Sequence, residues 1–236
     1  MNALIRLVYD AGYADLVYYL FHALGFIGIL LFNVFYAKNY KISKKDAAIL
    51  TIVTYAIAYV WVYVLAYIEN QFSNWGANNI VRAFVWFPLI ALIPNLFLKI
   101  DKKDLCDFIA PCCALVQAIS HIGCIFAGCC QGYPMTDGLY NPVSQMTVFP
   151  SQLVECGVAL AIFFLCIWMA KHFGDSVNGK IFPLFLVSFG ATRFVLEFFR
   201  ANRKIIGNIS ILALHALLMV IVGMIWLALA SRKQEE

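Results

Sequence analysis

The segment from Ser120 to Gly132 holds one histidine, three cysteines and three glycines, an unusual density of reactive and special residues for an apolar chain. His121 can act as a general base, because imidazole exchanges a proton readily near neutral pH. Cys124, Cys129 and Cys130 are thiols, which can serve as nucleophiles, metal ligands or redox groups. Close helix packing accounts for the glycines, and a buried, hydrogen-bonded structural histidine is equally compatible with the pattern.

Two other interpretations of these thiols are a metal site and a redox pair. One imidazole and three thiolates could satisfy a tetrahedral zinc ion, but the spacing from His121 through Cys124 to Cys129 and Cys130 lacks the usual ligand pairs. We therefore expect no metal, and no other cofactor. Electron exchange at Cys129 and Cys130 would make the chain a membrane thiol oxidoreductase, although it lacks the Cys-x-x-Cys pair that such chemistry usually employs.

A second group of chemical side chains lies in the apolar run 181–199 and directly after it. Arg193, Glu197 and Arg200 are spaced so that a helix places all three on one face. An Arg facing lipid at a helix centre costs at least about 2.5 kcal/mol, so this face must look into the bundle or into a wet cavity. The planar guanidinium fork suits a phosphate, which favours an anionic lipid headgroup as ligand. A purely structural ion pair is the alternative.

The third candidate group begins the run 151–170, which follows Pro150. Ser151 has the residue type and position of a helix N-cap, and the free amides of a helix N-terminus favour a nearby anion. Ordinary capping accounts for Ser151 and Gln152. A carboxylate in the first full turn of a spanning helix is harder to explain in this way, which makes Glu155 a candidate site residue.

The elements that must position these groups are membrane helices. Of the 236 residues, 63% are hydrophobic and 13% charged, with a mean hydropathy of +0.82, far from the composition of soluble domains. Since a spanning helix takes about 20 apolar residues, we expect an all-α polytopic membrane protein with a single transmembrane domain over residues 1–236. Pro88 and Pro94 predict a kink or break in the third helix. The apolar runs predict seven helices, at 13–37, 47–68, 79–98, 105–127, 151–170, 181–199 and 209–231.

The charge pattern predicts the topology. Eleven of the seventeen basic residues fall in alternate breaks between the runs: Lys38, Lys41, Lys44, Lys45, Lys99, Lys102, Lys103, Lys171, Lys180, Arg232 and Lys233. The positive-inside rule makes these breaks cytoplasmic, with the N-terminus outside and the C-terminus inside. The net charge of +4 is therefore a topology signal, and we expect no nucleic-acid partner. Arg200, Arg203 and Lys204 fall outside against the rule, which again favours an anionic lipid.

Four motifs in one order resemble those of the prolipoprotein diacylglyceryl transferases. They are Asp107-Phe108-Ile109-Ala110-Pro111, then Ile122-Gly123-Cys124 with Gly128-Cys129-Cys130-Gln131-Gly132, then Pro150-Ser151-Gln152-Leu153 with Glu155, then Arg193-Phe194 with Glu197-Phe198-Phe199-Arg200. The resemblance implies an integral enzyme of the bacterial cytoplasmic (inner) membrane. Such an enzyme moves the diacylglyceryl group of phosphatidylglycerol onto the lipobox Cys thiol of a prolipoprotein and releases glycerol phosphate.

The resemblance also implies roles for single residues. Arg193, Glu197 and Arg200 match functional positions of the family's sixth helix, Glu155 matches the acidic residue after Pro-Ser-Gln-Leu, and Gly132 closes the signature. Tyr18 is similar to a Tyr of the first helix. We expect catalytic roles for His121, Glu197 and Arg193. We expect substrate-binding roles for Arg200, Arg82, Glu155, Gln152, Gly132, Cys124 and Tyr18.

The sequence departs from the family pattern in three places. His121 stands where the signature usually has Arg, the His-Gly-Gly of the preceding helix is absent, and Phe149 stands where a His usually precedes Pro-Ser-Gln. Either His121 acts as the base while Arg82 supplies the missing positive charge, or the chain acts on another acceptor or binds phospholipid without chemistry. The expected partners are phosphatidylglycerol or a similar anionic phospholipid, a prolipoprotein signal peptide or other acceptor, and the membrane.

Overall fold

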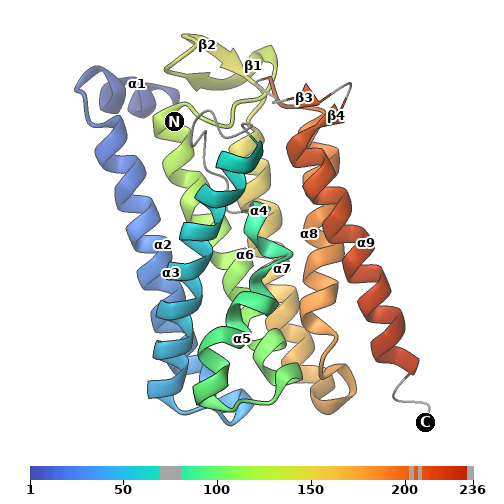
Figure 1. Cartoon of the computed structure of the whole chain (residues 1–236). Helices are drawn as coiled ribbons and strands as arrows, with labels where there is room; N and C mark the ends of the chain where they lie inside the picture. Colours follow the sequence, from blue (N-terminus) through green and yellow to red (C-terminus); the bar gives the residue numbers. More distant parts are fainter. Residues whose placement is uncertain (70–80, 202–204, 207–208, 233–236) are drawn as a thin grey trace.

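The computed structural model describes residues 1–69, 81–201, 205–206 and 209–232, and its long helices run roughly parallel in a bundle (Figure 1). The α-helices are α1 (Asn2–Asp10), α2 (Ala14–Tyr36), α3 (Lys44–Glu69), α4 (Val81–Phe84), α5 (Phe87–Leu98), α6 (Lys102–Ala127), α7 (Ser151–Phe173), α8 (Ile181–Glu197) and α9 (Ile211–Arg232). Short 3-10 helices are η1 (Ala37–Tyr40) and η2 (Gly174–Val177). The strands are β1 (Pro134–Asn141), β2 (Met146–Val148), β3 (Ile205–Ile206) and β4 (Ile209–Ser210).

Within the described residues, five helical segments are long and apolar enough to cross a membrane: Ala14–Tyr40, Lys44–Glu69, Lys102–Ala127, Ser151–Val177 and Ile211–Arg232. Large apolar side chains such as Phe35, Phe164 and Met224 are exposed on their outer faces. Such faces suit lipid, which is as apolar as the side chains themselves. The prediction of an all-α membrane protein is therefore confirmed at this level.

The third predicted helix, 79–98, is broken within its described residues, as Pro88 and Pro94 predicted. Among its described residues, α4 has 4 residues and α5 has 12, with Pro88 at the start of α5. Proline is favoured in the first turn of a helix because it lacks an N–H group. At a rise of 1.5 Å per residue, α5 is about 18 Å long, which is short for the ~30 Å hydrocarbon core. The predicted break is therefore confirmed over the described residues.

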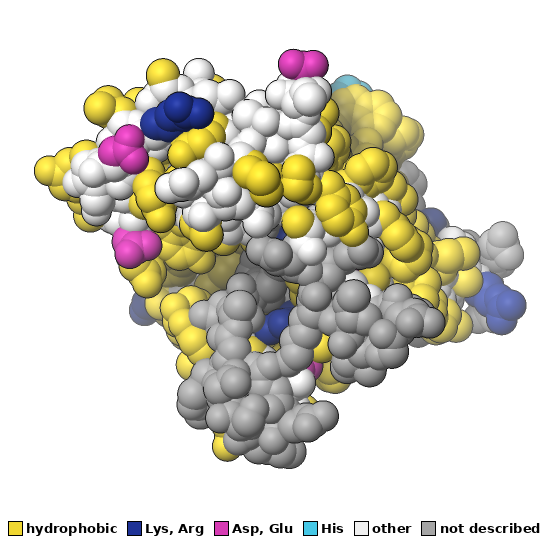
Figure 2. Space-filling view, turned by 90° about the horizontal axis from the view of Figure 1, so that it is seen from above, with side chains coloured by type: hydrophobic (Ala, Val, Ile, Leu, Met, Phe, Trp, Pro, Cys, Tyr) yellow, Lys and Arg dark blue, Asp and Glu magenta, His cyan; other side chains and the backbone are white. Residues whose placement is uncertain are grey.

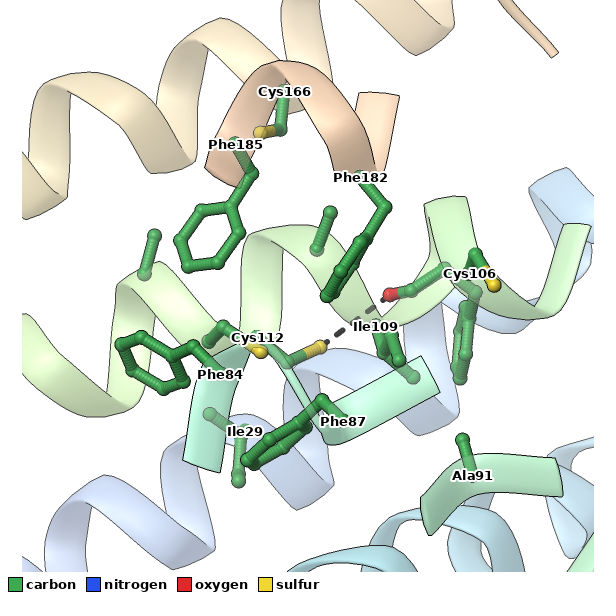
Figure 3. Packing of buried hydrophobic residues seen from close by; sticks show 14 of the residues in the cluster. Ile29, Phe84, Phe87, Ala91, Cys106, Ile109, Cys112, Cys166, Phe182 and Phe185 are labelled. Atoms are coloured by element: carbon green, nitrogen blue, oxygen red, sulfur yellow. Dashed lines mark hydrogen bonds between the residues drawn. The ribbon is translucent and has the colours of Figure 1, made fainter. Parts of the chain in front are cut away.

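Helix α6 forms the centre of the bundle. Of its most apolar 18-residue stretch, 78% is buried inside the protein, against 28–33% of the corresponding stretch in each of the other four long segments. Rings from α4, α5 and α8 surround its middle (Figure 3), where the Phe84 and Phe185 centroids lie 5.4 Å apart. Cys112 is fully buried there and donates from its sulfur to Asn33 Oδ1 over 2.6 Å. Cysteine in this environment behaves as a small hydrophobe.

Asp107 of α6 fixes the start of α8. Its carboxylate accepts hydrogen bonds from the backbone N–H groups of Gly179 at 2.6 Å and of Ile181 and Phe182 at 3.0 Å. The first N–H groups of a helix have no partner within the helix, and a carboxylate also complements the positive end of the helix dipole. Asp107 thereby joins the central helix to the helix that carries Arg193.

The two ends of the bundle differ (Figure 1). The basic end holds the connections 37–43, 99–101 and 174–180 and the last turn of α9, whereas the hairpin end holds α1 and the antiparallel hairpin of β1 and β2. Helix α1 and this hairpin lie in segments expected to be loops. Asn2 joins them, since its Oδ1 accepts the N–H of Tyr140 at 3.0 Å. Helices α6 and α8 end, and α7 begins, at the hairpin end, so the three candidate groups meet there.

Candidate active site

Glu155 is the centre of a buried charged cluster at the hairpin end. Its carboxylate accepts a 2.5 Å hydrogen bond from Arg200 Nη2 and lies 3.1 Å from His121 Nε2 and 3.6 Å from Arg193 Nε. These side chains come from α6, α7, α8 and the segment after α8, and none is more than 5% exposed. With Glu197, which pairs with Arg193, these residues form what we call the Glu155 cluster.

Arg193 has unused hydrogen-bonding capacity. Its Nη1 lies 2.7 Å from Glu197 Oε2, and Ser210 Oγ donates to Glu197 Oε1. Among the described residues, however, none of the three guanidinium nitrogens of Arg193 has an acceptor in hydrogen-bond geometry, although the residue is only 1% exposed. An unpaired buried donor costs about 1–3 kcal/mol, and more when it is charged. Such capacity is what an anionic ligand would use.

The charges of the cluster balance when His121 is neutral, because two guanidinium groups face two carboxylates. Burial disfavours the charged form of Arg200, but the charge of Glu155 outweighs it and raises the pKa of Arg200 above its ordinary value. Arg200 therefore stays cationic at the site.

His121 contacts two side chains, Glu155 and Gln117, through its Nε2 atom. Gln117 Nε2 donates to Glu155 Oε1 over 2.8 Å and is also in hydrogen-bond contact with His121 Nε2. His121 Nδ1 has no partner among the described residues. Sequence reasoning missed Gln117. Its spacing of four from His121, within an apolar helix, was the available signal.

Arg200 reaches the cluster from outside a helix. Helix α8 ends at Glu197, two residues before the expected end, and the backbone of Arg200 forms an antiparallel bridge with Gly132. A Cβ atom at Gly132 would lie 2.5 Å from the Phe149 carbonyl oxygen, so only glycine fits. Gly132 thus acts on the site through the backbone that carries Arg200.

The first two residues of α7 hold the loop that follows α6. Pro150 occupies the N-cap position, so the expectation of an N-cap at Ser151 is wrong. Ser151 Oγ instead donates to the Cys130 carbonyl over 2.6 Å, and Gln152 Nε2 donates to the Cys129 carbonyl over 2.7 Å. Both side chains act by positioning this loop.

Three thiols converge beside the Glu155 cluster. The sulfur atoms of Cys124, Cys129 and Cys130 all lie within 4.8 Å of one another. The four-ligand metal site considered from the sequence is not formed, because His121 Nε2 faces Glu155 instead. Hydrogen bonds from the other two thiols, Cys124 first, hold the pKa of Cys130 well below its usual value against the effect of burial.

Tyr18 and Arg82 occupy different surroundings. Tyr18 of α2 packs on α6 near Cys124, since a Cβ atom at Gly123 would lie 3.0 Å from the Tyr18 carbonyl oxygen. Arg82 Nη2 lies 3.0 Å from Glu69 Oε2, in a second charged group. The structure therefore gives no support to Arg82 as the replacement charge beside His121.

The second charged group joins three helices. His215 Nε2 of α9 lies 3.4 Å from Glu69 Oε1 at the end of α3, and Arg82 is on α4. Sequence reasoning did not select Glu69 or His215. Figure 2, which views the molecule from above Figure 1 and so onto the hairpin end, shows few charged side chains on the outer surface and Lys or Arg atoms visible near the centre of this face.

Comparison with known proteins identifies the relatives of the chain. The family model of prolipoprotein diacylglyceryl transferase matches residues 13–229. A relative named phosphatidylglycerol–prolipoprotein diacylglyceryl transferase from Clostridium tetani is 26% identical over 166 residues, which cover 64% of this chain and 65% of the relative. Proteins of the same name from Finegoldia magna and Bordetella parapertussis are 25% identical over 88% of this chain and 89% of the relative, and 32% identical over 52% and 50%.

The first relatives are matched over less than two thirds of their own length, at 65%, 46% and 53%. Their transferase name gives no support to a thiol oxidoreductase or to a non-catalytic lipid-binding protein. The family match extends over most of the sequence, including every helix that contributes to the Glu155 cluster. The chain belongs to the prolipoprotein diacylglyceryl transferase family.

Proposed function

We propose that this protein is an enzyme of the bacterial inner membrane that transfers the diacylglyceryl group of phosphatidylglycerol to the lipobox Cys thiol of a prolipoprotein. Family membership and the names of the relatives support this reaction class. The observation that carries the proposal is that the guanidinium donors of Arg193, at 1% exposure, have no acceptor in hydrogen-bond geometry among the described residues, next to Arg200. Two guanidinium groups directed at one buried place suit the phosphate of the lipid.

The reaction forms one bond and breaks one. The acceptor sulfur attacks the glyceryl carbon of the lipid, a C–S bond forms, and the C–O bond to phosphate breaks. The phosphate oxygen keeps the electron pair and leaves as glycerol phosphate. Arg193 and Arg200 stabilise the negative charge that develops on this leaving group, as preorganised donors do in other enzymes.

The thiol proton requires a base, and His121 fits this role. For this role the ring takes the tautomer with its proton on Nε2, which donates to Glu155 Oε1 at 3.1 Å and keeps the Nδ1 lone pair for the acceptor proton. An Nε2–H group cannot accept from the Gln117 amide, which in this state donates to Glu155 only. Glu155 holds the ring in place. Glu197 orients Arg193, while Gly132 and Gln152 position the backbone around Arg200 and Cys129.

We further infer seven spans in one transmembrane domain over residues 1–236, with the basic end in the cytoplasm. The basic connections gather at this end, which is the cytoplasmic signature of membrane proteins. Helix α1 and the end of α9 lie at opposite ends of the bundle (Figure 1), as an odd number of crossings requires. This orientation puts the Glu155 cluster toward the outer leaflet, where the acceptor would arrive.

The test is transfer of labelled diacylglyceryl from phosphatidylglycerol vesicles to a lipobox peptide by the purified chain in detergent. Arg193→Lys keeps the charge but loses the planar fork, and we expect a fall of about 10²-fold in rate. Arg6→Ala, at an exposed Arg of α1 on the same end, is the control and should transfer normally. Bound phospholipid without turnover in the unmodified chain would contradict the proposal.

A further inference from the structure

We propose that Cys124, Cys129 and Cys130 bind one zinc ion, with a fourth coordination position that takes the thiol of the acceptor. The zinc site is a property of this chain that the family match does not assign. Its role toward the acceptor rests on the proposed function, in which the acceptor is a thiol.

The distances between the thiols suit a metal ion. Zinc binds cysteine sulfur at about 2.3 Å, which places the sulfurs of a tetrahedral site about 3.8 Å apart. The three sulfurs lie within 4.8 Å of one another, so small rotations of the side chains close the site. Zinc sites with three protein ligands keep an open position for water or substrate, and soft thiolate ligands select zinc over hard cations.

The backbone around the thiols is already fixed in place. Cys130 has a φ of 58°, a conformation that residues other than glycine rarely adopt, and its carbonyl is held by Ser151. The carbonyl of Cys129 is held by Gln152. A strained conformation held by hydrogen bonds from a neighbouring helix is typical of functional sites. Packing alone gives no reason for three thiols to meet in this way.

The surroundings favour a site with net negative charge. Three thiolates and one zinc ion carry a charge of −1, and the backbone of the cationic Arg200 pairs with Gly132, two residues after Cys130. The guanidinium of Arg200 contacts Glu155 at 2.5 Å. An acceptor bound to zinc would therefore stand beside the group that we assign to the lipid phosphate.

The zinc ion would compensate for the absent His-Gly-Gly motif by activating the acceptor thiol. A thiol that coordinates zinc loses its proton, and His121 Nδ1 receives it in the proposed reaction. The sulfur then attacks the glyceryl carbon, and the electron pair of the breaking C–O bond leaves with the phosphate. No oxidant or reductant is involved. The metal lowers the free-energy cost of forming the thiolate beside Cys124, which is 7% exposed.

Cobalt(II) titration of the reduced, metal-free chain in detergent tests the site, because tetrahedral cobalt–thiolate complexes give visible d–d bands and ultraviolet charge-transfer bands. We expect one cobalt per chain with the intensity of three sulfur ligands, displaced by zinc. Cys129→Ser and Cys130→Ser should weaken binding by more than about 100-fold, since even indirect changes at metal sites cost 10–100-fold. The control Cys156→Ser, at a half-buried cysteine outside the group, should bind normally.

A lipobox peptide tests the fourth position. Its Cys form should raise the charge-transfer intensity by one further sulfur, whereas the same peptide with Ser should not. Absence of the three-sulfur bands in the reduced chain would overturn the site, and bands that do not respond to the Cys peptide would overturn its role toward the acceptor. In either case, transfer of diacylglyceryl by the metal-free protein would show that the proposed function does not depend on zinc.

Discussion

Replacing Glu155 by Gln tests whether this carboxylate holds the cluster together. The change keeps the size and shape of the side chain but removes one negative charge, so that two guanidinium groups face the single carboxylate of Glu197. Glu155 is 2% exposed, and breaking a buried ion pair by removing one partner costs about 3–5 kcal/mol. For a chain of this size, each kcal/mol shifts the melting temperature by about 2–4 °C, so we expect a fall of roughly 6–20 °C.

The assay is thermal unfolding of the purified chain in detergent, followed by the fluorescence of its five tryptophans. Asp137→Asn removes one exposed negative charge at the same end of the molecule and should leave the melting temperature unchanged. A double-mutant cycle of Glu155→Gln with Arg200→Gln should show a coupling of about 1–3 kcal/mol, as contacting residues do. If the Glu155→Gln and Asp137→Asn variants have the same melting temperature, or if the cycle shows no coupling, the cluster does not exist as described.

Two further substitutions test the elements that position the site. Asp107→Ala leaves three N–H groups at the start of α8 without their acceptor, and we expect a loss of about 3 kcal/mol or more in unfolding measurements, whereas Asp175→Ala, exposed at the same end, should have little effect. Gly132→Ala places a Cβ atom 2.5 Å from a carbonyl oxygen and should cost about 1–3 kcal/mol and lower transfer. Gly157→Ala, which meets nothing within 4 Å, is its control and should be neutral or stabilising.

The sequence predicted most helices because apolar runs and basic breaks are strong signals in membrane proteins. Six of the seven predicted ranges correspond to single helices within a few residues. The segment 79–98 contains two described helices because Pro88 sets a new helix start, and the sequence predicted this kink or break from its prolines. Helix α1 was not predicted, although its two-sided pattern, with Ile5 buried and Leu7 exposed, is typical of a short amphipathic helix.

The candidate site was predicted in part. The spacing of Arg193, Glu197 and Arg200 indicated one shared face, and the structure brings all three to Glu155 or its neighbours. Arg200 nevertheless arrives through a backbone bridge rather than along a helix. A helical pattern cannot show such a bridge, because the pairing depends on a residue far away in the sequence.

Contacts between distant segments account for the residues that the sequence did not identify. Gln117 carries no charge and no motif, and its importance appears only when Glu155 of another helix lies 2.8 Å away. The pairing of Arg82 with Glu69 is of the same kind. The three thiols were visible in the sequence, but their convergence depends on the turn after α6, which local spacing does not determine.

A structure of the chain with phosphatidylglycerol bound tests the central claim most directly. The account predicts that the lipid phosphate lies within about 3 Å of guanidinium nitrogens of both Arg193 and Arg200, as charge-assisted hydrogen bonds require, with the glyceryl carbon facing Cys124, Cys129 and Cys130. A phosphate bound only at the basic end, with the side chains of the Glu155 cluster unchanged and closely packed, would contradict it.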